Sequence, residues 1–180
     1  MDKANSATNQ MPTSQDELID IVDENDNVIG NEKRSVITQK QLSNYRVINA
    51  FLINSERKLW IPRRTPHKAI FPYGLDVSVG GYVESGESYE MAMARELEEE
   101  LNLELEQVCH KFLGHLNPHV HGISSFMKVY EIQCEQSPNY NSEDFVEAFW
   151  LTPKELIDKV SQEKYPPKSD LPKLVHIFYL

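Results

Sequence analysis

The hydrophobic pattern of the first third of the chain predicts strands. Apolar and acidic residues alternate in the run ELIDIVD, the polar turn ENDN follows, and the apolar pattern resumes in VIG, so residues 17–30 are expected to form a hairpin. Residues 33–42 are ambiguous and fit a short helix. The runs YRVINAFLI and KLWIPR, rich in β-branched and aromatic side chains, predict strands over residues 45–53 and 58–63, with Pro62 marking an edge or an end.

The remaining two thirds mix strands with helices. Further strands are expected at residues 75–79, 111–116, 123–134 and 144–151, and a loop is expected to begin at Asn117-Pro118. Thr152, Pro153 and Glu155 resemble a helix start, with a helix to about residue 160, and residues 171–180 favour a closing helix. This order of elements predicts a mixed sheet packed between helices, an α/β (α+β) fold.

The longest helix is predicted between residues 88 and 101. Ser88 is a suitable N-cap, and Glu90 lies in the first turn, where the helix dipole favours negative charge. Asn102 is expected to end the helix in the left-handed conformation, which asparagine adopts more readily than most residues.

Length and charge narrow the classes of function. The 180 residues fit a polar, disordered tail over residues 1–16 and one domain over residues 17–180. The net charge of −10 argues against nucleic acid as a partner, because such binding needs a basic face. No apolar run approaches the roughly 18 residues of a spanning helix, and the N-terminus lacks the apolar core of a signal peptide. Two isolated cysteines favour reduced thiols, with a single disulfide pair as the alternative, so a cytoplasmic protein without a membrane partner is expected.

A conflict of like charges singles out the long helix. At 100° per residue, Glu100 lies about 40° to one side of Glu96 and Glu99 about 60° to the other, so three carboxylates share one face. Like charges at this spacing are mildly destabilising, which suggests that a cation binds there. Glu98 points away and is interpreted as solvated surface. The alternative on composition alone is an ordinary acidic helix in solvent.

Converging carboxylates are the ligands of a hard cation such as Mg²⁺ or Mn²⁺. Magnesium keeps several waters and is usually completed by substrate phosphates. A bound cation eases deprotonation of water and makes a bridged phosphate a better electrophile. The residues themselves therefore predict metal-assisted attack of water on a phosphoryl group.

The stretch from Gly81 to Leu103 resembles the Nudix box, G-x5-E-x7-R-E-U-x-E-E-x-G-U with U apolar. Every fixed position matches except one, because Asn102 stands where the family has glycine. The resemblance implies a Nudix-like α/β/α sandwich that carries the box as a loop–helix–loop motif. It also implies hydrolysis of a diphosphate bonded to another group, X.

The resemblance assigns metal binding to four residues. Glu96, Glu99 and Glu100 would be ligands, and a backbone carbonyl of Gly80 or Gly81 would be a further one, since glycine permits close backbone approach. The catalytic base varies within the family and stays open.

Arg95 and Glu87 complete the implied catalytic residues. They are expected to pair with each other and to hold the carboxylates in place, because such outer contacts fix the orientation of metal ligands. The partner is then a small-molecule diphosphate, and a homodimer is expected because family members often dimerise.

Candidates outside the box are less specific. Arg63, Arg64 and Lys68 precede the box and are candidates for binding substrate phosphates, with ordinary solvated surface as the alternative.

Two later segments also carry polar side chains that could serve the site. His119 and His121 could contact substrate, and Glu143, Asp144 and Glu147 could supply a ligand or base. Exposed loop and strand positions are the simpler interpretation of all five.

The segments IVDENDNVIG and RRTPHKAIFPYGLDVSVGG look like the Nudix branch that contains isopentenyl-diphosphate isomerases and their hydrolase relatives. Isomerases of that branch carry a catalytic cysteine where residues 80–83 here are Gly-Gly-Tyr-Val. Neither Cys109 nor Cys134 is near. The sequence therefore favours a diphosphate hydrolase, with an isomerase or a non-catalytic Nudix-fold binding module as alternatives, and it leaves X unidentified.

Overall fold

The computed structural model describes residues 16–180. An N-terminal unit, residues 16–42, holds a two-stranded antiparallel sheet of β1 (Leu18–Val22) and β2 (Val28–Lys33), followed by α1 (Arg34–Lys40). The predicted hairpin is thus confirmed, and the ambiguous segment is a short helix. The expected tail over residues 1–16 lies, except for Asp16, outside the described residues, and the single-domain expectation stays a prediction.

The main sheet has six strands in the order β6-β7-β3-β4-β8, and β5 pairs with β3. It is mixed, as expected, because β3 and β7 run parallel while the other pairs are antiparallel. The strands are β3 (Arg46–Ile53), β4 (Leu59–Arg64), β5 (Val79–Tyr82), β6 (His110–Leu116), β7 (Phe126–Gln133) and β8 (Phe145–Leu151). The remaining helices are α2 (Tyr89–Leu101), α3 (Pro118–His121), α4 (Pro153–Gln162) and α5 (Leu171–Tyr179), with a 3-10 turn, η1, at Leu105–Gln107.

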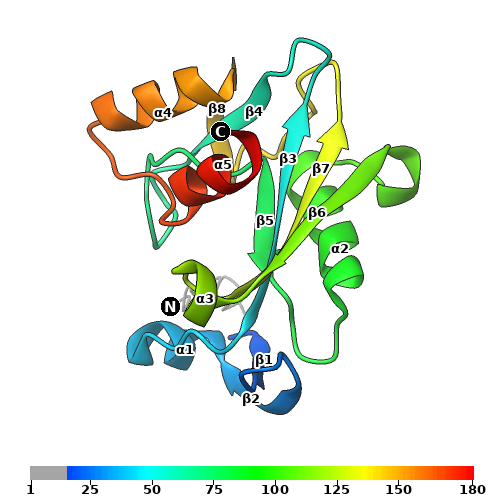
Figure 1. The fold of residues 1–180 in the computed structure, drawn as a ribbon, viewed down its shortest axis with the longest axis vertical. Coiled ribbons are helices and arrows are strands. Elements are labelled where there is room, and N and C mark those ends of the chain that lie inside the picture. The colour runs from blue at the N-terminus through cyan, green and yellow to red at the C-terminus, as the bar shows by residue number, and fades with distance from the viewer. Residues whose placement is uncertain (1–15) are drawn as a thin grey trace, which may run out of the picture.

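The central strand β3 explains the layers. Its side chains alternate between the two faces of the sheet, as the period of a strand requires. Ile48, Ala50 and Leu52 pack with α2 on one face. Phe51 and Ile53 pack with α4 and α5 on the other. Figure 1 shows the sheet with α2 on one side and α4 and α5 on the other, which is the predicted arrangement.

The predicted helix ends are confirmed. The Ser88 hydroxyl accepts a hydrogen bond from the N–H of Met91, and Asn102 ends α2 in the left-handed region at φ 52°. Thr152 and Glu155 form a capping box at the start of α4. Local side-chain chemistry therefore fixes the direction in which α2 presents its glutamates.

Three expectations were wrong, and two of them concern segments that connect the main elements. Residues 75–78 are not a regular strand, because polar side chains take the place of ladder hydrogen bonds: the Ser78 hydroxyl bonds the backbone of Leu52 and Trp60. The strand begins at Val79 and includes the glycine pair. The expected loop after Asn117 begins with α3, whose first turn Asn117 caps.

The third error concerns Pro62. It lies inside β4, which has neighbours on both sides, rather than at an edge or an end. The only residue pair between β3 and β4 is Ile53 with Leu59 among the described residues, so the two strands have separated before Pro62 and its missing N–H leaves no gap in that ladder.

Within residues 16–180, no helix combines the length and apolar character needed to cross a membrane. Cys109 and Cys134 are free thiols, as expected.

Candidate functional site

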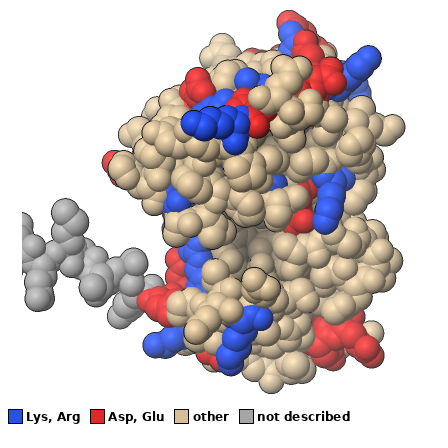
Figure 2. All heavy atoms as spheres, turned by 90° about the vertical axis from the view of Figure 1, so that its left-hand side faces the viewer, with Lys and Arg blue, Asp and Glu red and all other residues tan. Residues whose placement is uncertain are grey.

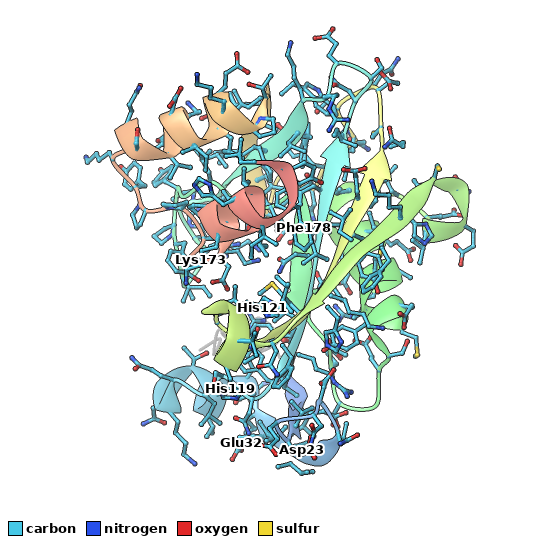
Figure 3. All side chains as sticks on the ribbon, in the orientation of Figure 1. Asp23, Glu32, His119, His121, Lys173 and Phe178 are labelled. Carbon is cyan, nitrogen blue, oxygen red and sulfur yellow. The ribbon has the colours of Figure 1, made fainter. Side chains whose placement is uncertain are left out.

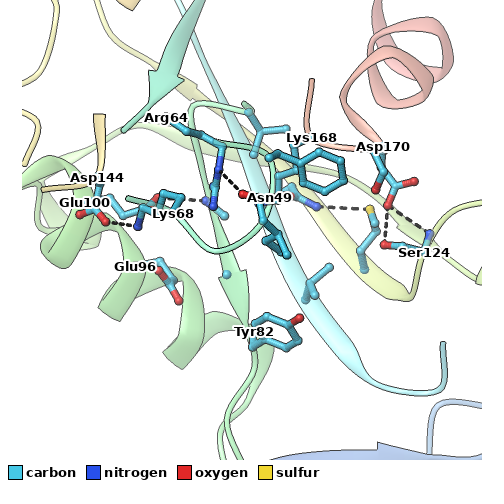
Figure 4. Close-up of a pocket in the computed structure, with 18 of the residues that line it drawn as sticks. Asn49, Arg64, Lys68, Tyr82, Glu96, Glu100, Ser124, Asp144, Lys168 and Asp170 are labelled. Carbon is cyan, nitrogen blue, oxygen red and sulfur yellow. Dashed lines mark hydrogen bonds and ion pairs between the residues drawn. The ribbon is translucent and has the colours of Figure 1, made fainter. Parts of the chain in front are cut away.

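A cavity of about 440 Å³ opens between α2, the N-terminal unit and the segments that precede β5 and α5. Figure 2 looks onto this face, where the surface is hollowed between the N-terminal unit and the rest of the molecule. Figure 4 shows Glu96 and Glu100 on one side of the cavity and Ser124 and Asp170 on the other, with Asn49 between them.

The glutamate face of α2 forms one end of this cavity, and Glu96, Glu99 and Glu100 all line it. Glu100 is 9% exposed, and its Oε2 accepts a hydrogen bond of 3.2 Å from the N–H of Gly80. Glu96 lies against Gly81 so closely that a Cβ built there would be 1.8 Å from its Oε1. The glycine pair thus lets two carboxylates pack directly on the backbone of β5.

Burial and like charge make it costly for Glu96 and Glu100 to be ionised at the same time. Burial, followed by the charges of Glu96 and Asp76, raises the pKa of Glu100 well above its usual value. Burial also raises the pKa of Glu96, although the adjacent Arg95 opposes the shift. Glu99 differs, since 59% of its side chain is exposed. The charge conflict inferred from the sequence is therefore sharpest between Glu96 and Glu100.

Arg95 binds several acidic groups at this end. Its Nε and Nη2 donate to the two oxygens of Glu87, each at 2.9 Å, which is the predicted pair. Its Nη1 also donates to Glu96 Oε1 at 2.8 Å, and its Nη2 donates to the carbonyl oxygen of Tyr82. Although burial opposes it, this bidentate contact lowers the pKa of Glu87. The arginine thereby fixes the position of Glu96 relative to β5.

The three predicted basic residues have different positions. Arg64 and Lys68 line the cavity. The Nη1 of Arg64 contacts Asp76 at 2.6 Å, and Lys68 pairs with Asp144. Arg63 is not among the described residues of the lining.

The guanidinium of Arg63 is held instead by carboxylates on the opposite side of β4. Its Nε is 2.5 Å from Glu147, and its Nη2 is 2.8 Å from Glu163.

Lys168 is a cavity residue that the sequence did not single out. Its Nζ is 3.3 Å from Asp76 Oδ1, and its positive charge partly counters the raised pKa values of Glu96 and Glu100. It lies in the loop before α5, far from the box in sequence, where no motif marks it.

Of the other candidates, Asp144 lines the cavity, whereas Glu143 and Glu147 are not among its described lining residues. His119 and His121 belong to α3, which Figure 3 shows between the N-terminal unit and α5. Both histidines are exposed, and neither is among the described lining residues.

The rest of the cavity combines aromatic and polar groups. Tyr45 and Tyr82 are stacked with ring centroids 5.2 Å apart. Ser124 donates to Asp170 from both its N–H and its hydroxyl. Asn49 is 4% exposed, and its amide nitrogen donates to the sulfur of Met127, which is a weak acceptor. These residues come from four separate segments, and short-range sequence patterns do not bring them together.

The glutamate end fits a divalent cation by its donor set. Among residues 16–180, no three His, Cys, Asp or Glu side chains are already arranged to hold a metal ion. Glu96 and Glu100 are nevertheless hard oxygen donors of like charge that repel each other, and a cation between them would remove this repulsion. Glu99 would approach by rotation of its exposed side chain.

Comparison with known proteins agrees with this geometry. The NUDIX domain profile matches residues 44–171. An uncharacterized Nudix hydrolase from Nostoc sp. is 57% identical over 163 residues, covering 91% of this chain and 96% of the relative. A Nudix hydrolase from Deinococcus radiodurans is 43% identical over 164 residues, covering 91% and 95%.

Solved structures give the same result. The crystal structure of a Deinococcus radiodurans protein, 43% identical, superposes with a TM-score of 0.85 over 91% of this chain and 100% of its own. A MutT protein from Methanosarcina mazei, 17% identical, shares the fold with a TM-score of 0.56 over 74% and 91%. The chain belongs to the Nudix hydrolase family, whose members hydrolyse pyrophosphate-containing compounds.

Proposed function

We propose that this Nudix hydrolase is a Mg²⁺- or Mn²⁺-dependent enzyme that cleaves the diphosphate linkage of a small organic diphosphate by attack of water. The observation that carries the proposal is a pair of carboxylates, the buried Glu100 and the Glu96 side chain that is 12% exposed, at one end of a cavity of about 440 Å³. A cavity of this size accommodates a small molecule.

The residues of the glutamate end would bind the metal. Glu96, Glu99 and Glu100 would hold the cation, together with a backbone carbonyl at Gly80 or Gly81. When bound, the cation lowers the pKa of a coordinated water and polarises a phosphoryl oxygen.

The other residues of the site orient the metal-binding carboxylates or neutralise the charge of the substrate phosphates. Arg95, fixed by Glu87, keeps the carboxylate of Glu96 in place. Arg64, Lys68 and Lys168 line the same cavity and present positive charge to the substrate phosphates. Arg63 is left out, because it is not among the described residues that line the cavity, and Glu147 and Glu163 bind its guanidinium elsewhere.

The alternatives have less support. An isomerase related to the isopentenyl-diphosphate enzymes would need a thiol near the box, and neither Cys109 nor Cys134 is among the described residues that line the cavity. A non-catalytic binding module would not need the complete set of box glutamates. A cytoplasmic location and a homodimer complete the proposal.

A substrate panel tests the reaction. Nucleoside diphosphates, nucleotide sugars and isoprenoid diphosphates are incubated with Mg²⁺ or with EDTA, and phosphate release and product identity are measured. We expect hydrolysis of at least one compound, a fall of roughly tenfold or more in EDTA, and recovery with excess Mg²⁺. Full activity in EDTA would contradict the metal assignment, and conversion of isopentenyl diphosphate to its isomer would support the alternative.

Gly81→Ala should reduce turnover by displacing Glu96. The new methyl group would stand 1.8 Å from Glu96 Oε1, so the carboxylate must move away from β5. A displacement of this kind should lower kcat roughly tenfold or more. Gly30→Ala is the matched control, because a Cβ there meets nothing within 4 Å. Equal kcat values in the two variants would show that the position of Glu96 does not matter for the reaction.

A further inference from the structure

The N-terminal unit lies outside residues 44–171, which match the NUDIX domain, yet it is fastened to the box. The N–H of Ser85 donates to the Leu18 carbonyl at 2.8 Å. The Ser85 hydroxyl and the Gly86 N–H donate to the two oxygens of Asp20 at 2.6 and 3.1 Å. Asp20 is 7% exposed, so these contacts are shielded from solvent. The unit is therefore held in a fixed position against the loop that precedes α2.

Two side chains of this unit line the cavity, Glu17 and Arg34. The guanidinium carbon of Arg34 lies 4.6 Å from the centroid of the Tyr82 ring, and Tyr45 stacks on the same ring. Arg34 Nη1 is 2.9 Å from Glu17 Oε2. The ring of Tyr82 thus presents Arg34 beside the strand whose glycines contact Glu96 and Glu100.

The ion pair of Arg34 with Glu17 determines which part of a substrate Arg34 can bind. Arg64 and Lys168 share one carboxylate, Asp76, which is not among the described lining residues, so this pair of cations keeps positive charge for a phosphate. Arg34 is instead paired one to one with Glu17, which itself lines the cavity and would repel a phosphate. A guanidinium beside a carboxylate instead offers hydrogen-bond donors and acceptors side by side. Ser124 and Asp170 are further polar groups of the cavity, on the side away from Glu96 and Glu100 (Figure 4).

We propose that the N-terminal unit is a specificity element of this enzyme: Arg34 and Glu17 bind the X group of the substrate, and X is a polar group with hydrogen-bond donors and acceptors rather than a hydrocarbon chain. This inference rests on the proposed function for the position of the diphosphate at Glu96 and Glu100. Tyr82 gives the same group an aromatic edge to pack against.

Binding of non-cleavable analogues tests the inference without relying on turnover. The probes are methylene-bridged analogues of adenosine, cytidine, guanosine and uridine diphosphates and of geranyl diphosphate, with methylenediphosphonate as the probe that lacks X. Calorimetry with Mg²⁺ gives each Kd. We expect at least one nucleoside probe to bind the wild-type protein roughly tenfold or more tightly than the geranyl probe.

Arg34→Ala should weaken binding of that nucleoside probe roughly tenfold and leave the Kd of methylenediphosphonate unchanged, because only the former reaches Arg34. Lys33→Ala is the matched control, since the exposed Lys33 is a neighbouring cation outside the described lining. Glu17→Gln removes the carboxylate charge with little change in shape, and it should alter which nucleoside binds best. Thermal unfolding confirms that each variant is folded.

The outcomes separate the two proposals. Equal loss of affinity for methylenediphosphonate would place Arg34 at the phosphates and overturn the inference, as would unchanged nucleoside binding or a preference for the geranyl probe. Arg34-dependent nucleoside binding without hydrolysis of the cleavable compounds would support the specificity role and contradict the proposed reaction.

Discussion

Replacing Glu100 by glutamine should lower kcat/KM by about 10³-fold, which corresponds to about 4 kcal/mol of lost transition-state stabilisation. Glutamine keeps the shape of the side chain and an oxygen that can accept the hydrogen bond from Gly80 N–H. It removes the negative charge that would bind a cation. A loss of this size would identify Glu100 as a ligand and not as a packing residue.

The same substitution should not destabilise the protein without metal. Glu100 is buried beside the carboxylates of Glu96 and Asp76, whose charges oppose its ionisation. Neutral glutamine removes that repulsion, so the Tm in EDTA should stay the same or rise. Glu98→Gln is the matched control, because Glu98 is exposed on the same helix. Near-normal kcat/KM, or a large fall in Tm, would contradict this account of Glu100.

Arg95→Ala should reduce both activity and stability. Removal of the guanidinium leaves Glu87 and Glu96 without their partner, and it frees the carbonyl of Tyr82. Because the Arg95 side chain is only 24% exposed, we expect a loss of about 2 kcal/mol in the free energy of unfolding. We also expect a roughly 10²-fold fall in kcat/KM, as for other groups that orient metal ligands.

Two further variants separate charge from geometry. Arg95→Lys keeps the charge but cannot bind both oxygens of Glu87, so its activity should lie between that of the alanine variant and the wild type. A double-mutant cycle with Glu87→Ala, followed by chemical denaturation, should give a coupling energy well above zero. Additive effects on stability would show that the pair has no structural role.

Local chemistry made much of the fold predictable. The hairpin, α2 with Ser88 and Asn102 at its ends, and the start of α4 depend on residues within a few positions of one another. Residues 75–78 escaped prediction because the hydroxyl of Ser78 bonds the backbone of Leu52, 26 positions earlier. A periodic apolar pattern cannot reveal such a long-range replacement of a ladder bond.

The candidate site was predictable only in part for the same reason. The glutamate face follows from helical spacing, but Lys168 reaches the cavity from a loop far beyond Glu100 in the sequence. Arg63 and Arg64 are adjacent, so a strand turns them to opposite sides, and a register shift between them complicates the pattern further. The sequence cannot decide which of the two arginines faces the cavity.

The ion pair between Lys68 and Asp144 has a consequence for the order of binding. The charge of Asp144 is felt by Glu100, and Lys68 partly masks that charge while the two are paired. A phosphate that draws Lys68 away would leave Asp144 unmasked and make the glutamate end more negative, which strengthens its attraction for a cation. Thermodynamic reciprocity then requires that a cation strengthen phosphate binding by the same factor. Metal and substrate would bind with positive cooperativity even before any direct bond between them is counted.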